Sequence, residues 1–132
     1  MIKRPVHNRF NTAILEGRKI TTIRDKPWPV GKPIMLYNWL GRPYHSNQSD
    51  LTPVIVSGFW TIQITHHADG TLSYLKGMQH ARELYETEGF DSREDMDTWF
   101  RPLVKPGMAI SKCLMRFNML NGEVSNSGQK NK

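Results

Sequence analysis

Cysteine is almost absent from this sequence, and Cys113 is the only one. A single thiol excludes an intrachain disulfide and a zinc site built from cysteines. No run of about 20 apolar residues is present, as a membrane-spanning helix would require. The first ten residues also lack the apolar stretch of a secretory signal. We therefore expect a cytoplasmic protein with no membrane partner.

The common cofactor and metal motifs are missing as well. The sequence contains no GxGxxG, no phosphate-binding loop and no HExxH. His66 and His67 are adjacent, and neighbouring side chains of a strand point to opposite faces, so they cannot bind the same ion. We interpret this pair as part of a surface turn. We expect no metal and no cofactor.

One hydrophobic core is what a chain of this size can form. The 132 residues include four Trp, four Tyr and five Phe, and 38% of all residues are hydrophobic. Residues 121–132 contain one apolar side chain. We therefore predict a single domain over residues 1–120, followed by a flexible polar tail over 121–132, and we expect a monomer.

Charge is distributed unevenly along the chain, which has a net charge of +6. Residues 1–45 carry nine Lys or Arg and two Asp or Glu, whereas residues 79–100 carry two basic and seven acidic side chains. A basic first third suits an anionic partner, with nucleic acid or a nucleotide as the first candidates.

Hydrophobic periodicity predicts a mixture of short helices and antiparallel strands. Apolar spacing indicates a helix over residues 8–18 and two helices within residues 79–100. Runs rich in β-branched and aromatic residues predict strands over residues 20–24, 34–40, 53–66 and 108–120. Gly58 lies in the middle of the longest strand, where a bulge or a corner is expected. The order of elements indicates an α+β fold.

One segment combines residues that can perform chemistry. Gly17, Lys19, Thr22 and Arg24 have the spacing G-x-K-x-x-T-x-R, at the junction of the first helix and the first strand. A lysine desolvated beside an arginine has a lowered pKa and can act as a base toward a hydroxyl or a water. The same residues can equally form a solvated basic edge, and both interpretations stay open on this evidence.

A family resemblance adds to this interpretation. The segment EGRKITTIRD (residues 16–25), the strand ending in YNW and the segment YETEGFDSREDMDTWF occur in the order found in the ASCH domain. The chain resembles that family over residues 8–118. The resemblance implies a PUA-like fold, a small β-barrel of about five or six mostly antiparallel strands with flanking helices.

Within the family, the motif is most similar to the small bacterial N4-acetylcytidine amidohydrolases. The resemblance implies hydrolysis of N4-acetylcytidine, or a related acylated pyrimidine nucleoside, to cytidine and acetate without a metal. It implies Lys19 as general base, Thr22 as nucleophile and Glu88 as proton donor, with Glu86 as the alternative acid. Arg24 is a candidate contact to an oxyanion or a phosphate.

Two features leave an alternative function open. The loop over residues 41–53 is enlarged relative to those hydrolases, and the wider family includes RNA-binding proteins and proposed ribonucleases. An RNA-binding module for single-stranded RNA, with or without ribonuclease activity, is therefore the second hypothesis. Tyr37 and Trp39 fall on the same face of their strand, and we expect one of them to line the pocket and stack a base.

Overall fold

The computed structural model describes residues 1–120, which form a mixed sheet covered by short helices. The strands are β1 (Ile2–Pro5), β2 (Thr21–Arg24), β3 (Pro33–Trp39), β4 (Gln48–His66), β5 (Leu72–Lys76), β6 (Gln79–His80) and β7 (Ala109–Met119). The α-helices within this range are α1 (Asn11–Leu15), α2 (Leu84–Glu88) and α3 (Arg93–Phe100), and single 3₁₀ turns cover Asn8–Phe10 and Arg101–Leu103. The predicted α+β class is confirmed. The predicted tail, 121–132, lies outside the described residues.

The 19-residue strand β4 organises the sheet. One edge of β4 pairs with β3 along its first half and with β5 along its second half, while its other edge pairs with β7. Strand β7 also pairs with β2, and β1 is added parallel to β3. The path of the sheet ends at β1 on one side and β6 on the other, so the strands described by the structure form an open sheet rather than a closed barrel.

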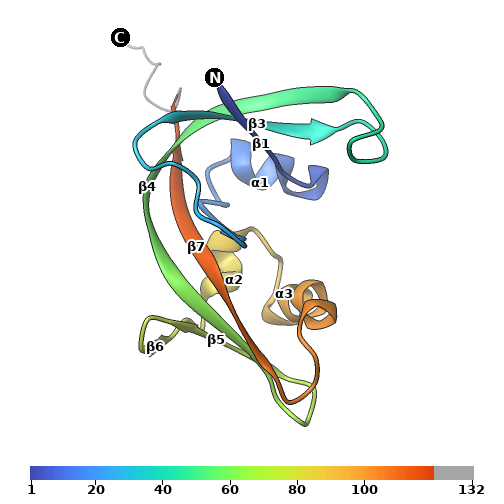
Figure 1. The fold of residues 1–132 in the computed structure, drawn as a ribbon, viewed down its shortest axis with the longest axis vertical. Helices are drawn as coiled ribbons and strands as arrows, with labels where there is room; N and C mark the ends of the chain where they lie inside the picture. Colours follow the sequence, from blue (N-terminus) through green and yellow to red (C-terminus); the bar gives the residue numbers. More distant parts are fainter. Residues whose placement is uncertain (121–132) are drawn as a thin grey trace.

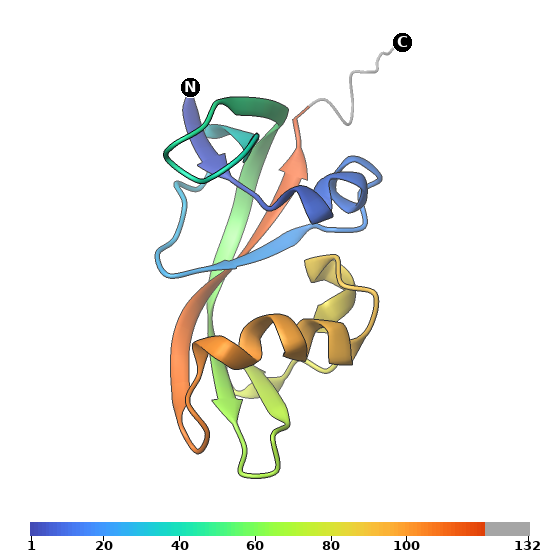
Figure 2. The same ribbon diagram turned by 90° about the vertical axis from the view of Figure 1, so that its right-hand side faces the viewer.

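The sheet is strongly curved, and the helices lie on its concave side (Figure 1). The view in Figure 2 shows α1 near one end of the curved pair β4 and β7, with α2 and α3 nearer the other end. The pairing of β4 with β7 shifts between Val56 and Gly58, which confirms the bulge expected at Gly58. Fully buried aliphatic side chains from β3, β4 and β7 form the core with α3, including Ile34, Val54, Ile62, Ile64, Met96 and Leu114.

The first helix differs from its prediction. The segment 8–18 is split into the 3₁₀ turn at Asn8–Phe10 and the short helix α1. His7 caps the 3₁₀ turn, because its side chain accepts the Arg9 backbone N–H at 3.0 Å. Gly17, with φ of 79°, follows the helix as expected for a glycine that ends one.

Other boundaries were missed. Strands β1, β5 and β6 were not predicted. Strand β4 begins at Gln48, so the loop before it is shorter than the loop predicted over residues 41–53. The surface-turn interpretation is wrong for His66, whose buried Nδ1 lies 2.8 Å from the Val104 carbonyl oxygen. No helix within residues 1–120 is both long and apolar enough to cross a membrane.

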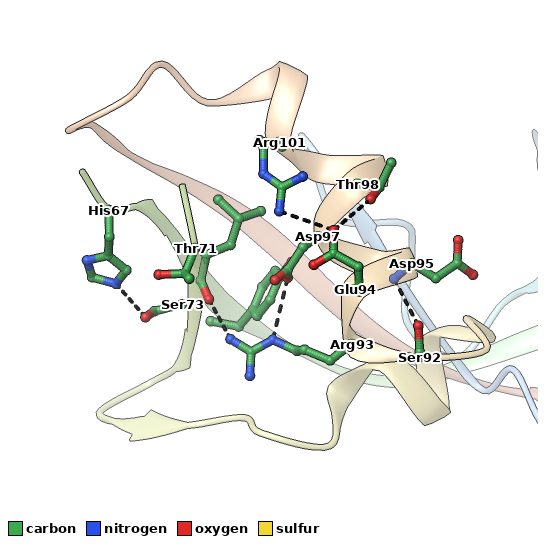
Figure 3. Close-up of polar contacts among 12 residues, drawn as sticks. His67, Thr71, Ser73, Ser92, Arg93, Glu94, Asp95, Asp97, Thr98 and Arg101 are labelled. Carbon is green, nitrogen blue, oxygen red and sulfur yellow. Dashed lines mark hydrogen bonds and ion pairs between the residues drawn. The ribbon is translucent and has the colours of Figure 1, made fainter. Parts of the chain in front are cut away.

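Helix α3 is fixed to β5 by a buried polar cluster (Figure 3). The Tyr74 hydroxyl donates to the Asp97 carboxylate at 2.6 Å, and burial, reinforced by this carboxylate, raises the pKa of Tyr74. Arg93, one turn before Asp97, donates to the Leu72 carbonyl oxygen. Ser92 caps the helix by accepting the Asp95 N–H at 3.1 Å, as serine commonly does at this position. These contacts hold α3 in the position from which its last turn reaches the cavity described next.

Candidate functional site

A cavity of about 410 Å³ opens on the concave side of the sheet, between the chain around His7, strand β2 and helix α3. Its aromatic lining consists of Phe10, Trp39, Tyr44, Phe90, Trp99 and Phe100. Its polar and charged lining consists of His7, Lys19, Thr22, Arg24 and Glu88. The cavity therefore brings together the three residues that the resemblance implies for catalysis, with Arg24 beside them.

Lys19 is a buried cation with a defined environment. Its side chain is 4% exposed, and its Nζ donates to the carbonyl oxygens of Thr21 at 2.8 Å and Glu88 at 2.7 Å. The Nζ also lies 4.6 Å from the centre of the Phe10 ring. Burial lowers the pKa of Lys19, the Arg24 charge acts in the same direction, and Glu88 opposes both. Two carbonyl oxygens therefore fix the direction of the Lys19 amino group in the cavity wall.

Glu88 is the carboxylate closest to this lysine. It is 2% exposed, and its Oε1 lies 3.8 Å from the Lys19 Nζ. Its Oε2 lies 2.5 Å from the Thr21 Oγ1. Glu88 ends α2, whereas Glu86 is exposed and does not line the cavity. Of the two carboxylates considered from the sequence, the structure brings Glu88 to the site.

Thr22 and Arg24 project from β2 on the same face, as alternation in a strand requires. The Arg24 Nε donates to the Thr22 Oγ1 at 3.0 Å, and the Arg24 guanidinium lies 4.8 Å from the Trp28 ring centre. Burial lowers the pKa of Arg24, with Glu88 opposing this effect. A cationic donor on a hydroxyl oxygen favours its deprotonated form, so Arg24 is placed to activate Thr22.

The two aromatic candidates of β3 have different positions. Trp39 lines the cavity, whereas Tyr37 is buried and does not. Their ring centres are 5.4 Å apart at 80°, so Tyr37 packs edge-on against Trp39. Tyr37 therefore supports the cavity wall without contacting its interior.

Several lining residues carried little signal in the sequence. Tyr44 is 82% exposed, has a positive φ of 64°, and lies 5.2 Å from Trp39 between ring centres. A non-glycine residue with positive φ is unusual and marks a constrained loop. Phe10, Phe90 and Trp99 pack edge-to-face or tilted on one another. Phe10 lies in the first 3₁₀ turn, Phe90 between α2 and α3, and Trp99 in α3, so their meeting at one cavity depends on the tertiary fold.

No three His, Cys, Asp or Glu side chains within residues 1–120 are placed to hold a metal ion. The chemistry available from the cavity residues is that of a base, a hydroxyl nucleophile and an acid, with an arginine to stabilise negative charge.

Gly89 has a direct connection to the position of Lys19. Its φ is 88°, and a Cβ added there would lie 2.9 Å from the Lys19 Cβ. We expect Gly89→Ala to lower the free energy of unfolding by about 2–4 kcal/mol, because left-handed backbone strain of about 1 kcal/mol adds to overpacking. Thermal unfolding with Gly17→Ala as control separates the two effects, since Gly17 has φ of 79° and a Cβ added there would have no neighbour within 4 Å. Equal losses for both variants would contradict the contact with Lys19.

Comparison of the chain with known protein families, with curated proteins and with solved structures gives no match. The functional argument therefore rests on the side chains of the cavity.

Proposed function

We propose that this protein is an amidohydrolase of the ASCH type, with a PUA-like fold, that cleaves N4-acetylcytidine or a related acylated pyrimidine nucleoside to cytidine and acetate. One observation carries the proposal. Lys19, Thr22 and Glu88 are each at most 4% exposed and line the same cavity, although 66 positions separate Thr22 from Glu88. Burial of a base, a nucleophile and an acid together is costly for folding, and such costs are typical of active sites.

The proposed chemistry depends on where the proton shared by Lys19 and Glu88 resides. Moving one proton from the Lys19 Nζ to the Glu88 carboxylate converts an ion pair into a neutral amine and a carboxylic acid. The low dielectric of a buried site reduces the advantage of the ion pair over the neutral pair. A neutral Lys19 and a protonated Glu88 are the forms that base and acid roles need.

The proposed reaction uses each group once in the first step. Lys19 takes the proton of the Thr22 hydroxyl, directly or through a water, and the Thr22 oxygen bonds to the acetyl carbonyl carbon. Arg24 donates to the Thr22 oxygen and so stabilises the negative charge that this oxygen gains as its proton leaves. The C–N bond breaks as Glu88 gives its proton to the departing N4 amine. Lys19 passes the proton that it took from Thr22 to the Glu88 carboxylate and is again a neutral base. Water then attacks the acetyl ester of Thr22, and Lys19 takes a proton from this water and returns it to the Thr22 oxygen as acetic acid leaves.

The cavity also suits the size and shape of a nucleoside. Small-molecule sites commonly occupy about 300–1,000 Å³, and the volume of about 410 Å³ lies near the lower end of that range. Trp39, Tyr44 and Trp99 provide flat apolar surfaces for a pyrimidine ring, in the way that aromatic side chains bind bases.

Hydrolysis of N4-acetylcytidine is the direct test, with cytidine release followed by chromatography. We expect activity from the wild-type protein and none from Lys19→Ala, while Lys32→Ala, at an exposed lysine, retains full activity. The rate should rise with pH as Lys19 loses its proton, in a range below the usual lysine pKa of about 10.4, because burial lowers the pKa of Lys19. It should fall again at higher pH, once no proton is left in the site for the departing amine. Equal release by wild-type and Lys19→Ala protein would contradict the proposal.

The second candidate function is RNA binding, and the exposed aromatic side chain at the mouth of the cavity favours it. Tyr44 is exposed and lies beside Trp39, and the segment 1–45 is strongly basic. An RNA-binding module predicts that affinity for single-stranded RNA falls as salt rises and falls further in Arg24→Ala and Tyr44→Ala. Affinity unchanged by salt and by both substitutions would exclude it. Incubation of RNA with the protein in EDTA tests for metal-independent cleavage.

A further inference from the structure

A second cavity, of about 300 Å³, lies on the other face of β2. Thr21 and Thr22 are neighbours in this strand, so their side chains point to opposite faces. Thr22 lines the first cavity, and Thr21 lines the second together with Thr87 of α2. The wall between the two cavities is therefore thin at this point, and Glu88 is part of it.

A continuous series of hydroxyl groups crosses this wall. The Glu88 Oε2 lies 2.5 Å from the Thr21 Oγ1, and the Thr21 Oγ1 lies 3.2 Å from the Thr87 Oγ1. The Thr87 hydroxyl can also donate to the Leu84 carbonyl oxygen at 3.2 Å. Exposure increases along the series, because Glu88 is 2% exposed, Thr21 is 7% exposed and Thr87 is half-buried at the second cavity.

We propose that Thr21 and Thr87 form a proton relay between Glu88 and the second cavity. The inference rests on the proposed amide hydrolysis and extends it, because it assigns a role to two residues outside the candidate catalytic set. A hydroxyl group both donates and accepts a hydrogen bond, which is what a relay requires. Each member of the series lies within hydrogen-bond distance of the next.

The proton balance of the reaction explains why a relay is needed. A neutral amide and water give a carboxylate, a neutral pyrimidine amine and one proton at neutral pH. The product acid loses its proton beside Lys19 and Glu88, so this pair holds one proton more than at the start. Lys19 and Glu88 are 4% and 2% exposed, so little of either group meets bulk water through the first cavity. The second cavity provides an exit that the product does not fill.

The transfer conserves every hydroxyl proton. Protonated Glu88 gives its proton to the Thr21 oxygen, while the original Thr21 proton passes to the Thr87 oxygen. The original Thr87 proton passes to an acceptor in the second cavity. Both hydroxyl groups end with one proton each, and rotation about their C–O bonds restores the starting arrangement.

Charged groups lie on both sides of the wall. Lys19 and Arg24 line the first cavity together with Glu88. The second cavity is lined by the basic groups Lys76, His80 and Arg116 and by the carboxylate of Glu83. His80 and Glu83 are exposed, and either can take a proton and pass it to water.

Steady-state kinetics on N4-acetylcytidine test the relay with matched variants of the full-length chain. We expect Thr87→Val to lower kcat by about 100-fold with KM unchanged, which is the lower end of the effect of losing a proton-transfer group. The solvent isotope effect should become larger. Thr87→Ser should behave as wild type. Added imidazole should restore kcat in Thr87→Val, since a small base can enter the second cavity. The Thr87 hydroxyl is hydrogen-bonded to Thr21 and to the Leu84 carbonyl oxygen rather than to the Glu88 carboxylate. A purely positional role of Thr87 predicts neither the larger isotope effect nor the rescue by imidazole.

Proton NMR of the substrate-free protein gives a readout that does not depend on hydrolysis. A hydroxyl in a 2.5 Å contact should give a slowly exchanging, low-field signal, lost in Thr21→Val and kept in Thr21→Ser. Its exchange with water should slow several-fold in Thr87→Val. Wild-type kcat, isotope effect and exchange rate in Thr87→Val would overturn the relay while leaving the hydrolase proposal intact. Absence of hydrolysis by the wild-type protein would overturn the proposed function and, with it, the role of the relay in turnover.

Discussion

We expect Thr22→Val to lower kcat for N4-acetylcytidine hydrolysis by about 10⁴-fold or more. Losses of this size are typical when the nucleophile is removed from a set of catalytic residues that act together. Valine keeps the shape of threonine and removes the hydroxyl, so the 4% exposed position stays packed. The Arg24 Nε then loses its acceptor inside the protein, which should also lower the free energy of unfolding by about 1–3 kcal/mol. Thr22→Ser should keep measurable activity, because it retains the hydroxyl.

Two measurements make this result specific. Thr61→Val removes a hydroxyl from the exposed part of β4 and should leave kcat unchanged. Mass spectrometry of wild-type protein quenched during turnover should find an acetyl group on the peptide that contains Thr22, and none in Thr22→Val. A Thr22→Val variant with at least a tenth of wild-type kcat would show that water, rather than Thr22, attacks the amide.

The second large effect concerns stability. We expect Lys19→Met and Glu88→Gln each to lower the free energy of unfolding by about 3–5 kcal/mol, because each leaves a buried charge without its partner. The double variant should be less destabilised than the sum of the two single changes by about 1–3 kcal/mol, as expected for groups in contact. Chemical denaturation of the four proteins completes this cycle.

An exposed ion pair provides the control. Lys3 and Asp50 lie 2.8 Å apart, with side chains 40% and 55% exposed. Lys3→Met should lower the free energy of unfolding by less than about 1 kcal/mol, since solvent screens such pairs. Losses of similar size for Lys3→Met and Lys19→Met would mean that Lys19 and Glu88 are not coupled in the folded protein.

Local patterns in the sequence account for much of the fold. Turn residues and β-branched runs predicted β2, β3, β4 and β7 within a few positions, and Gly58 marked the bulge. The edge strands β1 and β6 escaped prediction, because four-residue and two-residue strands show too few alternations to be recognised. The open arrangement of the sheet depends on which strands pair over long sequence distances, and no local pattern contains that information.

The candidate site was also predictable only in part, for the residues that lie close together in the sequence. Lys19, Thr22 and Arg24 lie within six residues of one another, so strand alternation placed Thr22 and Arg24 on one face. Glu88 came only from the family resemblance, since its approach to Lys19 depends on how α2 packs against β2. Alternation also put Tyr37 and Trp39 on one face, but tertiary packing decided that Trp39 lines the cavity. Thr21 was not predicted as a functional residue, because its sequence context indicates only a strand.

The pairing of β2 has a consequence for the order in which the chain folds. The strand that carries Thr22 and Arg24 is hydrogen-bonded in the sheet to Cys113–Arg116 of β7, about 90 positions later. Contacts between residues so distant in sequence form late and slow folding. During synthesis, β2 therefore has no sheet partner until β7 has left the ribosome. The cavity is assembled among the last features of the domain, so incomplete chains expose its aromatic residues and are the species most prone to aggregate.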